Sequence, residues 1–353
     1  MPNPTVAAGY PKAFLDFAVS RGADRQMLLE RSHIRLDDLK DQDDRVPLAN
    51  YMTLLKAGIE LCNEPALSLL FGEAVPLQEI SIVGMIGVAF DNVESVRRQV
   101  NSYAPLTLDP DDGGSADAIE FVRENGDVWL KFTTDIYSAN PLLIESGFAR
   151  NVSGARALAA SLPGFANLQF PKAIRFTHAE PSYRAEYDRI FGVPLFFDSH
   201  MNALLVDEAF LKMKLPRTNP YLSELLSARA EELIKSLQSS KTTRGRVENL
   251  LIPILHTGEA SIDTVAGKLG LSRQTLFRKL KAEGVSFAKV LDELRHNLAL
   301  HYLNGKKASV NETAYLVGFS EPAAFSRAFK RWTGSSPRMY ISRSVSSAKG
   351  ADA

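Results

Sequence analysis

The chain has 353 residues, of which 45% are hydrophobic and 23% charged, so its length predicts two or three domains and its composition excludes disordered and fibrous proteins. Lys and Arg balance Asp and Glu at 41 each, yet residues 241–353 hold 18 basic and 9 acidic side chains, which leaves 23 basic and 32 acidic ones in residues 1–240. A basic C-terminal part beside an acidic N-terminal part indicates that the former binds nucleic acid.

The first hundred residues carry apolar side chains at helical spacing. The i, i+3 and i+4 pattern predicts amphipathic helices over 11–22, 24–34 and 92–106. Two more helices are expected within 48–74, interrupted near Pro65, because the residue before a proline avoids the helical region. The chain is therefore predicted to be mostly α-helical up to about residue 107.

Beyond this point strands and helices are expected in mixed order. Residues 118–136 alternate apolar and polar side chains on either side of Asn125-Gly126, a dipeptide that favours the type I′ turn of a β-hairpin. The pattern then predicts helices over 143–162 and 183–192 and strands over 172–180, 194–199 and 202–211. Residues 1–214 are thus predicted to form an α+β domain.

A helical linker is predicted over residues 215–243. One apolar stripe runs along it, formed by Leu222, Leu225, Leu226, Leu233, Ile234 and Leu237. Two interpretations stay open, packing of the stripe on its own N-terminal domain or a homodimer interface. Residues 239–245 are expected to be a flexible joint, and a helix over 246–258 is expected to kink or break at Pro253.

Two stretches, 261–280 and 309–329, repeat one helix-turn-helix pattern. Each has a small residue where two helices cross, Ala266 or Ala314, and a glycine that tolerates a positive φ in the turn, Gly270 or Gly318. The second copy has one extra residue after its glycine. Apolar residues at core spacing complete the pattern: Val265, Leu269, Leu271, Leu276 and Leu280 in the first copy, and Val317, Phe319, Phe325 and Phe329 in the second.

A long helix is predicted between the two copies, with Ser286 as its N-cap and Gly305 as its end. About 18 residues at 1.5 Å each give it a length of roughly 27 Å. Successive major-groove faces on one side of DNA lie about 34 Å apart. One chain is therefore able to place two recognition helices in adjacent grooves.

Residues 291–340 resemble the signature of the AraC/XylS family of bacterial transcription regulators, including the stretch GFSEPAAFSRAFKRWTG and the following Pro337. The resemblance implies a double helix-turn-helix DNA-binding domain over 244–342, followed by a disordered tail at 343–353. It implies double-stranded promoter DNA and RNA polymerase as partners. The sequence shows neither a signal peptide nor an apolar run of about 18 residues, so we expect a cytoplasmic protein without a membrane partner.

The segments DRVPLANYMTLL, FGVPLFFDS and NALLVDEAFLKMKLP are similar to the effector-binding domain of the AraC subgroup that includes ornithine-utilisation regulators. This similarity implies a small-molecule effector without identifying the molecule or its pocket. Three aromatic residues of the predicted hairpin, Phe121, Trp129 and Phe132, are interpreted either as core residues or as pocket lining.

Base contacts are expected near the N-terminal ends of the two recognition helices, because that end enters the major groove. The resemblance places the family's base-reading arginines at Arg278 and Arg327. Phe277 has two interpretations, a core residue or a contact to a thymine methyl group. Ser272 and Ser320 are expected as N-caps whose helices offer backbone N–H groups to phosphate. The predicted DNA-contacting residues are Arg273, Gln274, Thr275, Arg278, Lys281, Ser320, Glu321, Ala323, Arg327 and Lys330.

Two alternative functions compete with a ligand-controlled regulator. The first is a DNA-repair enzyme, because related DNA-binding domains occur fused to alkyl-transfer modules that need an activated cysteine. The lone Cys62 has no neighbouring histidine or second cysteine, so we expect a structural thiol and no catalytic residue, metal site or cofactor. The second is a ligand-independent DNA-binding protein, which a missing ligand response would reveal.

Overall fold

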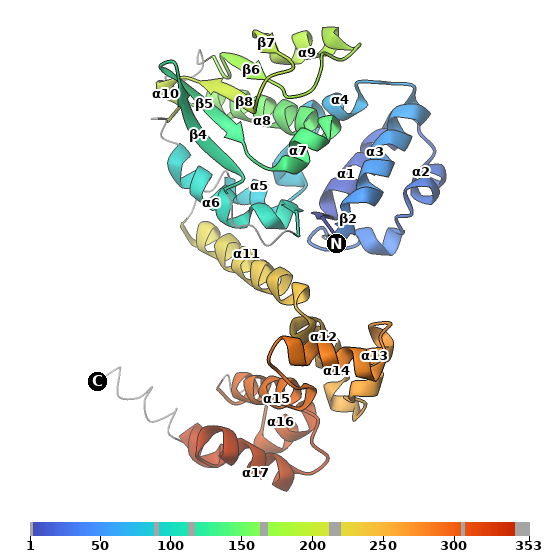
Figure 1. Ribbon diagram of the computed structural model, residues 1–353. Helices are drawn as coiled ribbons and strands as arrows, with labels where there is room; N and C mark the ends of the chain where they lie inside the picture. The colour runs from blue at the N-terminus through green and yellow to red at the C-terminus, as the bar shows by residue number, and fades with distance from the viewer. Residues whose placement is uncertain are drawn as a thin grey trace, which may run out of the picture. The chain divides into compact units, whose positions relative to one another are not determined.

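The helical periodicity of the first hundred residues corresponds to a series of α-helices in the computed structural model of the chain (Figure 1). The structure divides into two units, Met1–Lys235 and Ser236–Ala353. The predicted tail and residues 215–219 of the predicted linker lie outside the described part of the chain. The described residues are 3–87, 92–111, 117–162, 169–211, 220–304 and 308–342.

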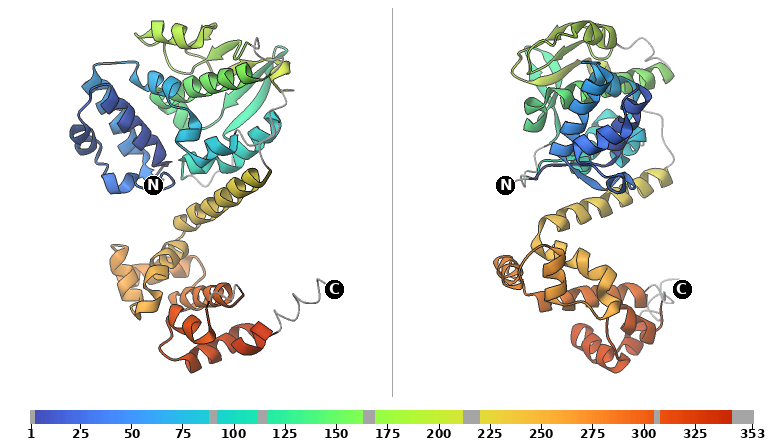
Figure 2. Two further views of the ribbon diagram at one scale, coloured as in Figure 1. Left: turned by 180° about the vertical axis from the view of Figure 1, so that it is seen from behind. Right: turned by 90° about the vertical axis from the view of Figure 1, so that its right-hand side faces the viewer.

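The first four helices share one hydrophobic core. The left view of Figure 2 shows these blue helices at one side of the first unit. Asn63 ends the third helix with a left-handed φ of 49°, which confirms the break predicted before Pro65. The helices are α1 (Gly9–Ser20), α2 (Arg25–Ser32), α3 (Leu48–Cys62), α4 (Leu67–Ala74), α5 (Ile82–Gly87) and α6 (Val93–Thr107), with 3-10 helices at Leu36–Leu39 and Leu77–Glu79.

A small antiparallel sheet, which the sequence did not predict, joins distant parts of this region. Its strands are β1 (Thr5–Ala7), β2 (Arg45–Pro47) and β3 (Leu108–Asp109), in the order β2-β1-β3. Arg45 stabilises the sheet because its guanidinium donates to the carbonyl oxygens of Thr5 at 2.9 Å and Leu106 at 2.6 Å. Strands of two or three residues are too short for an alternation of apolar and polar side chains to be recognised.

The predicted hairpin is confirmed and begins a five-stranded sheet of order β4-β5-β8-β6-β7. Asn125 and Gly126 both have positive φ values, 53° and 89°, as a type I′ turn requires. Only β6 and β7 pair in parallel, and the other neighbours are antiparallel. The strands are β4 (Ile119–Glu124), β5 (Asp127–Phe132), β6 (Ala173–Arg175), β7 (Leu195–Phe196) and β8 (Asn202–Val206).

The longest helix beside this sheet, α8 (Pro141–Ser161), covers one of its faces. Ile144, Phe148 and Val152 of α8 share a buried core with Ile174 and Leu204 of the sheet. The shorter helices of the region are α7 (Asp135–Ala139), α9 (Arg184–Phe191) and α10 (Glu208–Leu211).

The predicted linker helix is α11 (Pro220–Lys241). Its residues Leu222 and Leu225 are exposed, so the interpretation that the whole stripe packs on its own domain is wrong at these two positions. Helices cover most of residues 239–245, where a flexible joint was expected, because only Thr242 separates α11 from α12 (Thr243–Leu251). Helix α12 changes to a 3-10 helix at Ile252–Thr257, which confirms the break expected at Pro253.

Over its described residues, the second unit contains helices joined by turns and no strands. One hydrophobic core lies around each helix-turn-helix motif. The fold class predicted from the sequence, an α+β domain followed by an all-α domain, is confirmed. Over the described ranges, no helix has the length and apolar character that crossing a membrane requires. The remaining helices are α13 (Ile262–Lys268), α14 (Arg273–Ala282), α15 (Phe287–Asn304), α16 (Val310–Leu316) and α17 (Pro322–Thr333).

Candidate DNA-binding surface and ligand cavity

The first helix-turn-helix motif consists of α13 and α14. Ala266 is buried where the two helices meet, and its carbonyl oxygen accepts a hydrogen bond from the Leu271 N–H at 2.9 Å. Gly270 has a φ of 65°, as expected for the turn. Ser272 is the predicted N-cap of α14, since its Oγ accepts from the Thr275 N–H at 3.2 Å.

The second motif consists of α16 and α17 and has a more crowded turn. Ser309 and Glu312 form a capping box at the start of α16. Gly318 has a φ of 81°, and a Cβ at this position would lie 2.2 Å from the Leu255 carbonyl oxygen. The N-cap of α17 is Glu321 rather than the predicted Ser320, because Pro322 occupies the first helical turn and fixes where the helix begins.

Polar side chains of α15 hold the second motif, a role that sequence reasoning missed. Arg295 donates through Nε to the Val317 carbonyl oxygen at 3.0 Å and through Nη2 to that of Gly318 at 3.1 Å. Its guanidinium also lies 4.8 Å from the centre of the Phe319 ring. The Asp292 carboxylate accepts from Trp332 Nε1 at 2.9 Å. These contacts fix the turn and α17 to the connecting helix.

The two recognition helices expose the same pattern of side chains. Gln274, Arg278 and Lys281 are exposed along α14 at i, i+4 and i+7. The one extra residue after Gly318 brings Ala323, Arg327 and Lys330 to the equivalent exposed positions of α17. The buried positions correspond as well, Leu276 and Leu280 in α14 and Phe325 and Phe329 in α17. Within the described residues, the side chains of Arg278 and Arg327 make no hydrogen bond or ion pair.

Four other predicted contact residues lie at the N-terminal ends of these helices. Arg273 is exposed and forms an ion pair with Asp263 at 3.0 Å. Thr275 is half-buried, with its Oγ1 2.9 Å from the Ser272 Oγ, so its hydroxyl group belongs to the cap. Ser320 and Glu321 are exposed. Phe277 is 52% exposed, which excludes its interpretation as a core residue.

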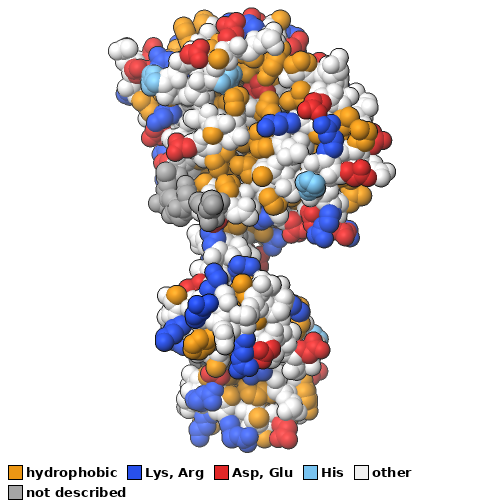
Figure 3. All heavy atoms as spheres, turned by 45° about the vertical axis from the view of Figure 1, so that its right-hand side comes forward, with side chains coloured by type: hydrophobic (Ala, Val, Ile, Leu, Met, Phe, Trp, Pro, Cys, Tyr) orange, Lys and Arg blue, Asp and Glu red, His pale blue; other side chains and the backbone are white. Residues whose placement is uncertain are grey.

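The surface charge of the second unit is also consistent with DNA binding by this unit. Figure 3 shows Lys and Arg side chains spread over the visible face of this unit. Residues 241–353 contain 18 basic and 9 acidic residues, so this part of the chain is cationic. Exposed cations of this kind favour binding to the phosphate backbone of nucleic acid.

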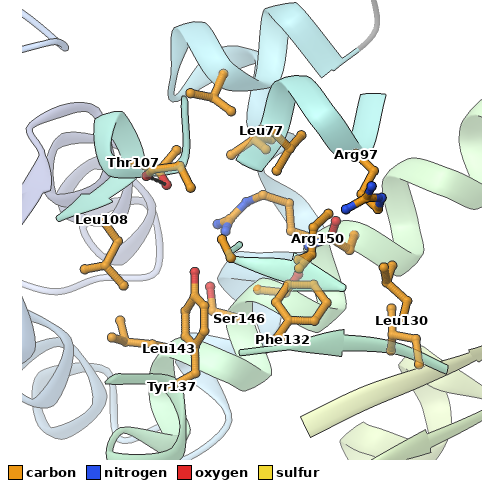
Figure 4. Close-up of a pocket in the computed structure, with 18 of the residues that line it drawn as sticks. Leu77, Arg97, Thr107, Leu108, Leu130, Phe132, Tyr137, Leu143, Ser146 and Arg150 are labelled. Carbon is orange, nitrogen blue, oxygen red and sulfur yellow. Dashed lines mark hydrogen bonds between the residues drawn. The ribbon is translucent and has the colours of Figure 1, made fainter. Parts of the chain in front are cut away.

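A cavity of about 250 Å³ lies in the first unit between α1, α3, α6, α8 and the β4–β5 hairpin (Figure 4). Most of its lining is aliphatic or aromatic, including Val96, Val100 and Leu130. Phe121 and Phe132 line the cavity, as one of the two interpretations proposed. Trp129 does not, because neighbouring residues of β5 point to opposite faces of the sheet, and it is buried under Arg175 instead.

One charged side chain in the cavity wall has no counter-charge among the described residues. Arg150 of α8 is only 7% exposed and donates through Nε to the Val75 carbonyl oxygen at 2.8 Å. Its Nη2 is buried and has no hydrogen-bond partner in the described chain. Burial lowers the pKa of Arg150, and the hydroxyl groups of Tyr10, Tyr51 and Tyr137 oppose that shift. Figure 4 shows the Arg150 guanidinium among the lining side chains, and the Tyr137 hydroxyl group points toward it.

A second buried charged group lies on α8 outside the cavity lining. Glu145 is fully buried, and its Oε2 accepts hydrogen bonds from the hydroxyl groups of Tyr187 at 2.7 Å and Tyr183 at 2.9 Å. Its Oε1 has no partner among the described residues. Burial raises the pKa of Glu145 to about 7, against the opposing effect of the two hydroxyl groups. Cys62, in contrast, is a free thiol whose pKa is raised by burial.

Comparisons with known proteins cover both units. Residues 22–215, more than half of the chain, match the family described as "Arabinose-binding domain of AraC transcription regulator, N-term". Residues 265–343 match the "Helix-turn-helix domain" family. The ornithine utilization regulator of Pseudomonas aeruginosa is 27% identical over 339 residues, which are 95% of this chain and 96% of the relative.

Two further proteins are similar to the chain. The HTH-type transcriptional regulator VirS of Mycobacterium tuberculosis is 24% identical over 93% of this chain and 93% of its own length. The crystal structure of the transcriptional regulator CdpR from Pseudomonas aeruginosa is 22% identical, with a TM-score of 0.37 over 79% of this chain and 87% of that chain. By its matched N-terminal domain and its helix-turn-helix domain, the chain belongs to the AraC family of DNA-binding transcription regulators.

Proposed function

We propose that this AraC-type regulator recognises a specific promoter sequence through α14 and α17 and that a small molecule in the cavity controls it. The matched exposed faces of the two recognition helices carry the first part of the proposal. Each face presents an arginine that has no partner among the residues the structure describes, followed by a lysine three residues later. Two unengaged arginines at equivalent positions suit the major grooves of two successive half-sites.

The exposed residues divide by chemistry into base-reading and phosphate-binding groups. Arg278 and Arg327 have a free guanidinium, which is suited to bidentate contact with guanine. Gln274 adds an amide that pairs with adenine, whereas Ala323 at the equivalent position offers only a methyl group. Arg273, Lys281 and Lys330 are assigned to phosphate contacts, which position the protein on the duplex but carry no sequence information. Helix α17 should therefore discriminate less between sequences than α14.

Substitution of single side chains on α14 tests this division. Arg278→Ala should weaken binding to the cognate site by about 1–3 kcal/mol and relax the preference at one base position, since a bidentate contact is lost. Lys281→Ala should weaken binding to cognate and random DNA alike. Both effects are measurable as dissociation constants on the two DNAs at one fixed salt concentration.

An exposed arginine outside the recognition helices provides the control. Arg246→Ala on α12 removes the same charge and should leave the ratio of cognate to random affinity unchanged. Equal losses on both DNAs for Arg278→Ala would remove the base-reading role of this residue.

The cavity supports control by a ligand, because it is enclosed mainly by apolar side chains and contains a few polar groups, as small-molecule sites do. A ligand that binds one arrangement of the chain more tightly than another shifts the population that is competent to bind DNA. The exposed Leu222 and Leu225 support self-association of the chain through α11. Recruitment of RNA polymerase in the cytoplasm belongs to the same proposal through the family relationship.

Two glycines of α8 allow ligand control to be tested. Gly147 lines the cavity and has open space at its Cβ, so Gly147→Leu should fill the cavity without a backbone clash. Gly154 lies on the same helix, is exposed and also has open space. We expect Gly147→Leu to abolish the response of a promoter reporter to a panel of carbon sources, while Gly154→Leu preserves it. A parent protein whose output never varies across the panel would favour the ligand-independent alternative.

A further inference from the structure

We propose that the cavity binds a monocarboxylate of about ten non-hydrogen atoms with an apolar body, and that Arg150 pairs with the carboxylate. This inference rests on the proposed ligand control and specifies the chemistry of the ligand. Three features carry it: a buried cation without a counter-ion, three neutral hydroxyl groups around it, and an apolar wall without an acidic residue.

The guanidinium of Arg150 is the first feature. A buried charge costs several kcal/mol unless it is paired. Among the described residues, only Nε of Arg150 finds a hydrogen-bond acceptor, and Nη2 is buried without one. Phe71 and Tyr10 rings lie 4.8 and 5.7 Å from the guanidinium carbon, so they contact the cation through their faces but supply no negative charge. The site therefore has an unmet requirement for an anion.

Three tyrosines near this cation are the second feature. Tyr10, Tyr51 and Tyr137 all line the cavity, and each interacts electrostatically with Arg150. Burial raises the pKa of every one of them, so their hydroxyl groups stay protonated and can donate to an anion. Their hydroxyl groups make no hydrogen bond within the described residues. A carboxylate, with two oxygens and about four acceptor positions, matches one guanidinium edge and neighbouring hydroxyl donors.

The remaining wall limits the rest of the ligand. Its other arginine, Arg97, is already paired with Glu94 at 2.7 Å and Asp117 at 3.2 Å, which leaves one unpaired cation and favours a monoanion. The described lining contains no Asp or Glu, so an ammonium group would find no partner there. A cavity of 150 Å³ holds benzene, and by this measure the present 250 Å³ accommodates about ten non-hydrogen atoms.

Octanoate, 1-octanol and octylamine test the inference, because they share one apolar chain and differ in the charge of the head group. Calorimetric titration of the full-length protein at neutral pH should give a dissociation constant for octanoate at least tenfold lower than for octanol, and no binding of octylamine. Octanol or octylamine binding as tightly as octanoate would overturn the inference, and so would the absence of octanoate binding.

Two substitutions assign the preference to particular side chains. Arg150→Met should abolish the preference for octanoate over octanol, while the ligand-free protein melts at the same or a higher temperature because an unpaired buried charge is removed. Tyr137→Phe removes one hydroxyl donor and should weaken octanoate binding about tenfold while octanol binding is unchanged. Arg98→Met should preserve the preference, because Arg98 is exposed on α6 and does not line the cavity. Octanoate binding that is insensitive to both Arg150→Met and Tyr137→Phe would overturn the assignment.

Operator binding measured in parallel separates this inference from the proposed function. Arg150-dependent octanoate binding without any change in operator affinity would support the carboxylate site and contradict ligand control. A promoter response that Gly147→Leu abolishes, in a protein that binds octanol as well as octanoate, would support ligand control and contradict the carboxylate site.

Discussion

Gly270 and Gly318 occupy equivalent turns, but their surroundings differ. Both have positive φ values, 65° and 81°, a region where a side chain is strained. A Cβ at Gly270 would meet open space, whereas a Cβ at Gly318 would lie 2.2 Å from the Leu255 carbonyl oxygen and 3.3 Å from Arg295 Nη2. Gly318 is thus required both by its backbone conformation and by close packing.

Alanine substitutions should separate these two requirements. Gly270→Ala should lower the free energy of unfolding by about 1–2 kcal/mol through the left-handed conformation alone. Gly318→Ala should cost about 1–3 kcal/mol more, because its methyl group overpacks against backbone. Urea unfolding followed by the fluorescence of Trp332, in a Trp129→Phe background, measures both. Equal losses for the two variants would show that the turn relaxes away from Leu255.

At the scale of one element, α8 contributes to both the sheet core and the cavity. Glu145 has its pKa raised to about 7 by burial, above the 4.5 of an ordinary glutamate. The native state therefore holds a proton that the unfolded chain releases between these two pH values. The contribution of this proton to the free energy of unfolding is fully present below pH 4.5 and is lost as the pH rises through 7.

Glu145→Gln should remove this dependence, because an amide stays neutral and can still accept from Tyr183 and Tyr187. Near pH 4.5 the free energy of unfolding of the variant should be close to that of the parent. Above pH 8 it should be higher by on the order of 3 kcal/mol. Thermal unfolding at both pH values measures the effect. Glu30→Gln, at an exposed position of α2, serves as the control and should follow the parent at both. Parallel behaviour of Glu145→Gln and the parent would contradict the assignment.

The elements that could be predicted from the sequence are those that a local pattern of residues identifies. The helices α1 to α4, the Asn125-Gly126 hairpin and both helix-turn-helix motifs have patterns of apolar residues or turn residues that identify them. The strands β1 to β3 are two or three residues long, too short for any alternation. Ser320 was predicted as an N-cap because serine favours that position, but the ring of Pro322 decides where α17 begins.

For the molecule as a whole, the length of α15 determines how two recognition helices meet one duplex. It has 18 residues and is therefore about 27 Å long. Arg295 and Asp292 fix the second motif to this helix. The connection between the motifs is thus rigid, and the half-site spacing should be fixed.

Footprinting of the full-length protein on its operator should show two short protected segments about 10 base pairs apart on one face of the DNA. Insertion of about 5 base pairs between them should abolish the second segment, since it moves that half-site to the opposite face. Protection that survives the insertion would show that the motifs move independently.

The exposed recognition face could be predicted from the sequence, but the cavity could not. Gln274, Arg278 and Lys281 lie close together in the sequence, and their spacing alone places them on one face. The cavity instead combines Tyr10 of α1, Tyr51 of α3 and Arg150 of α8, which lie far apart along the chain. Only the tertiary fold brings them together. In the amino-acid sequence, nothing on either side of Arg150 distinguishes it from a surface arginine.

The unequal recognition helices have one further consequence. Because α14 offers Gln274 where α17 offers Ala323, the chain is not symmetric about its connecting helix. A bound monomer therefore has a direction on the duplex, and inverting an operator would reverse the order in which the two motifs meet the promoter. Promoter output should depend on the orientation of the site, even where its affinity for the protein does not.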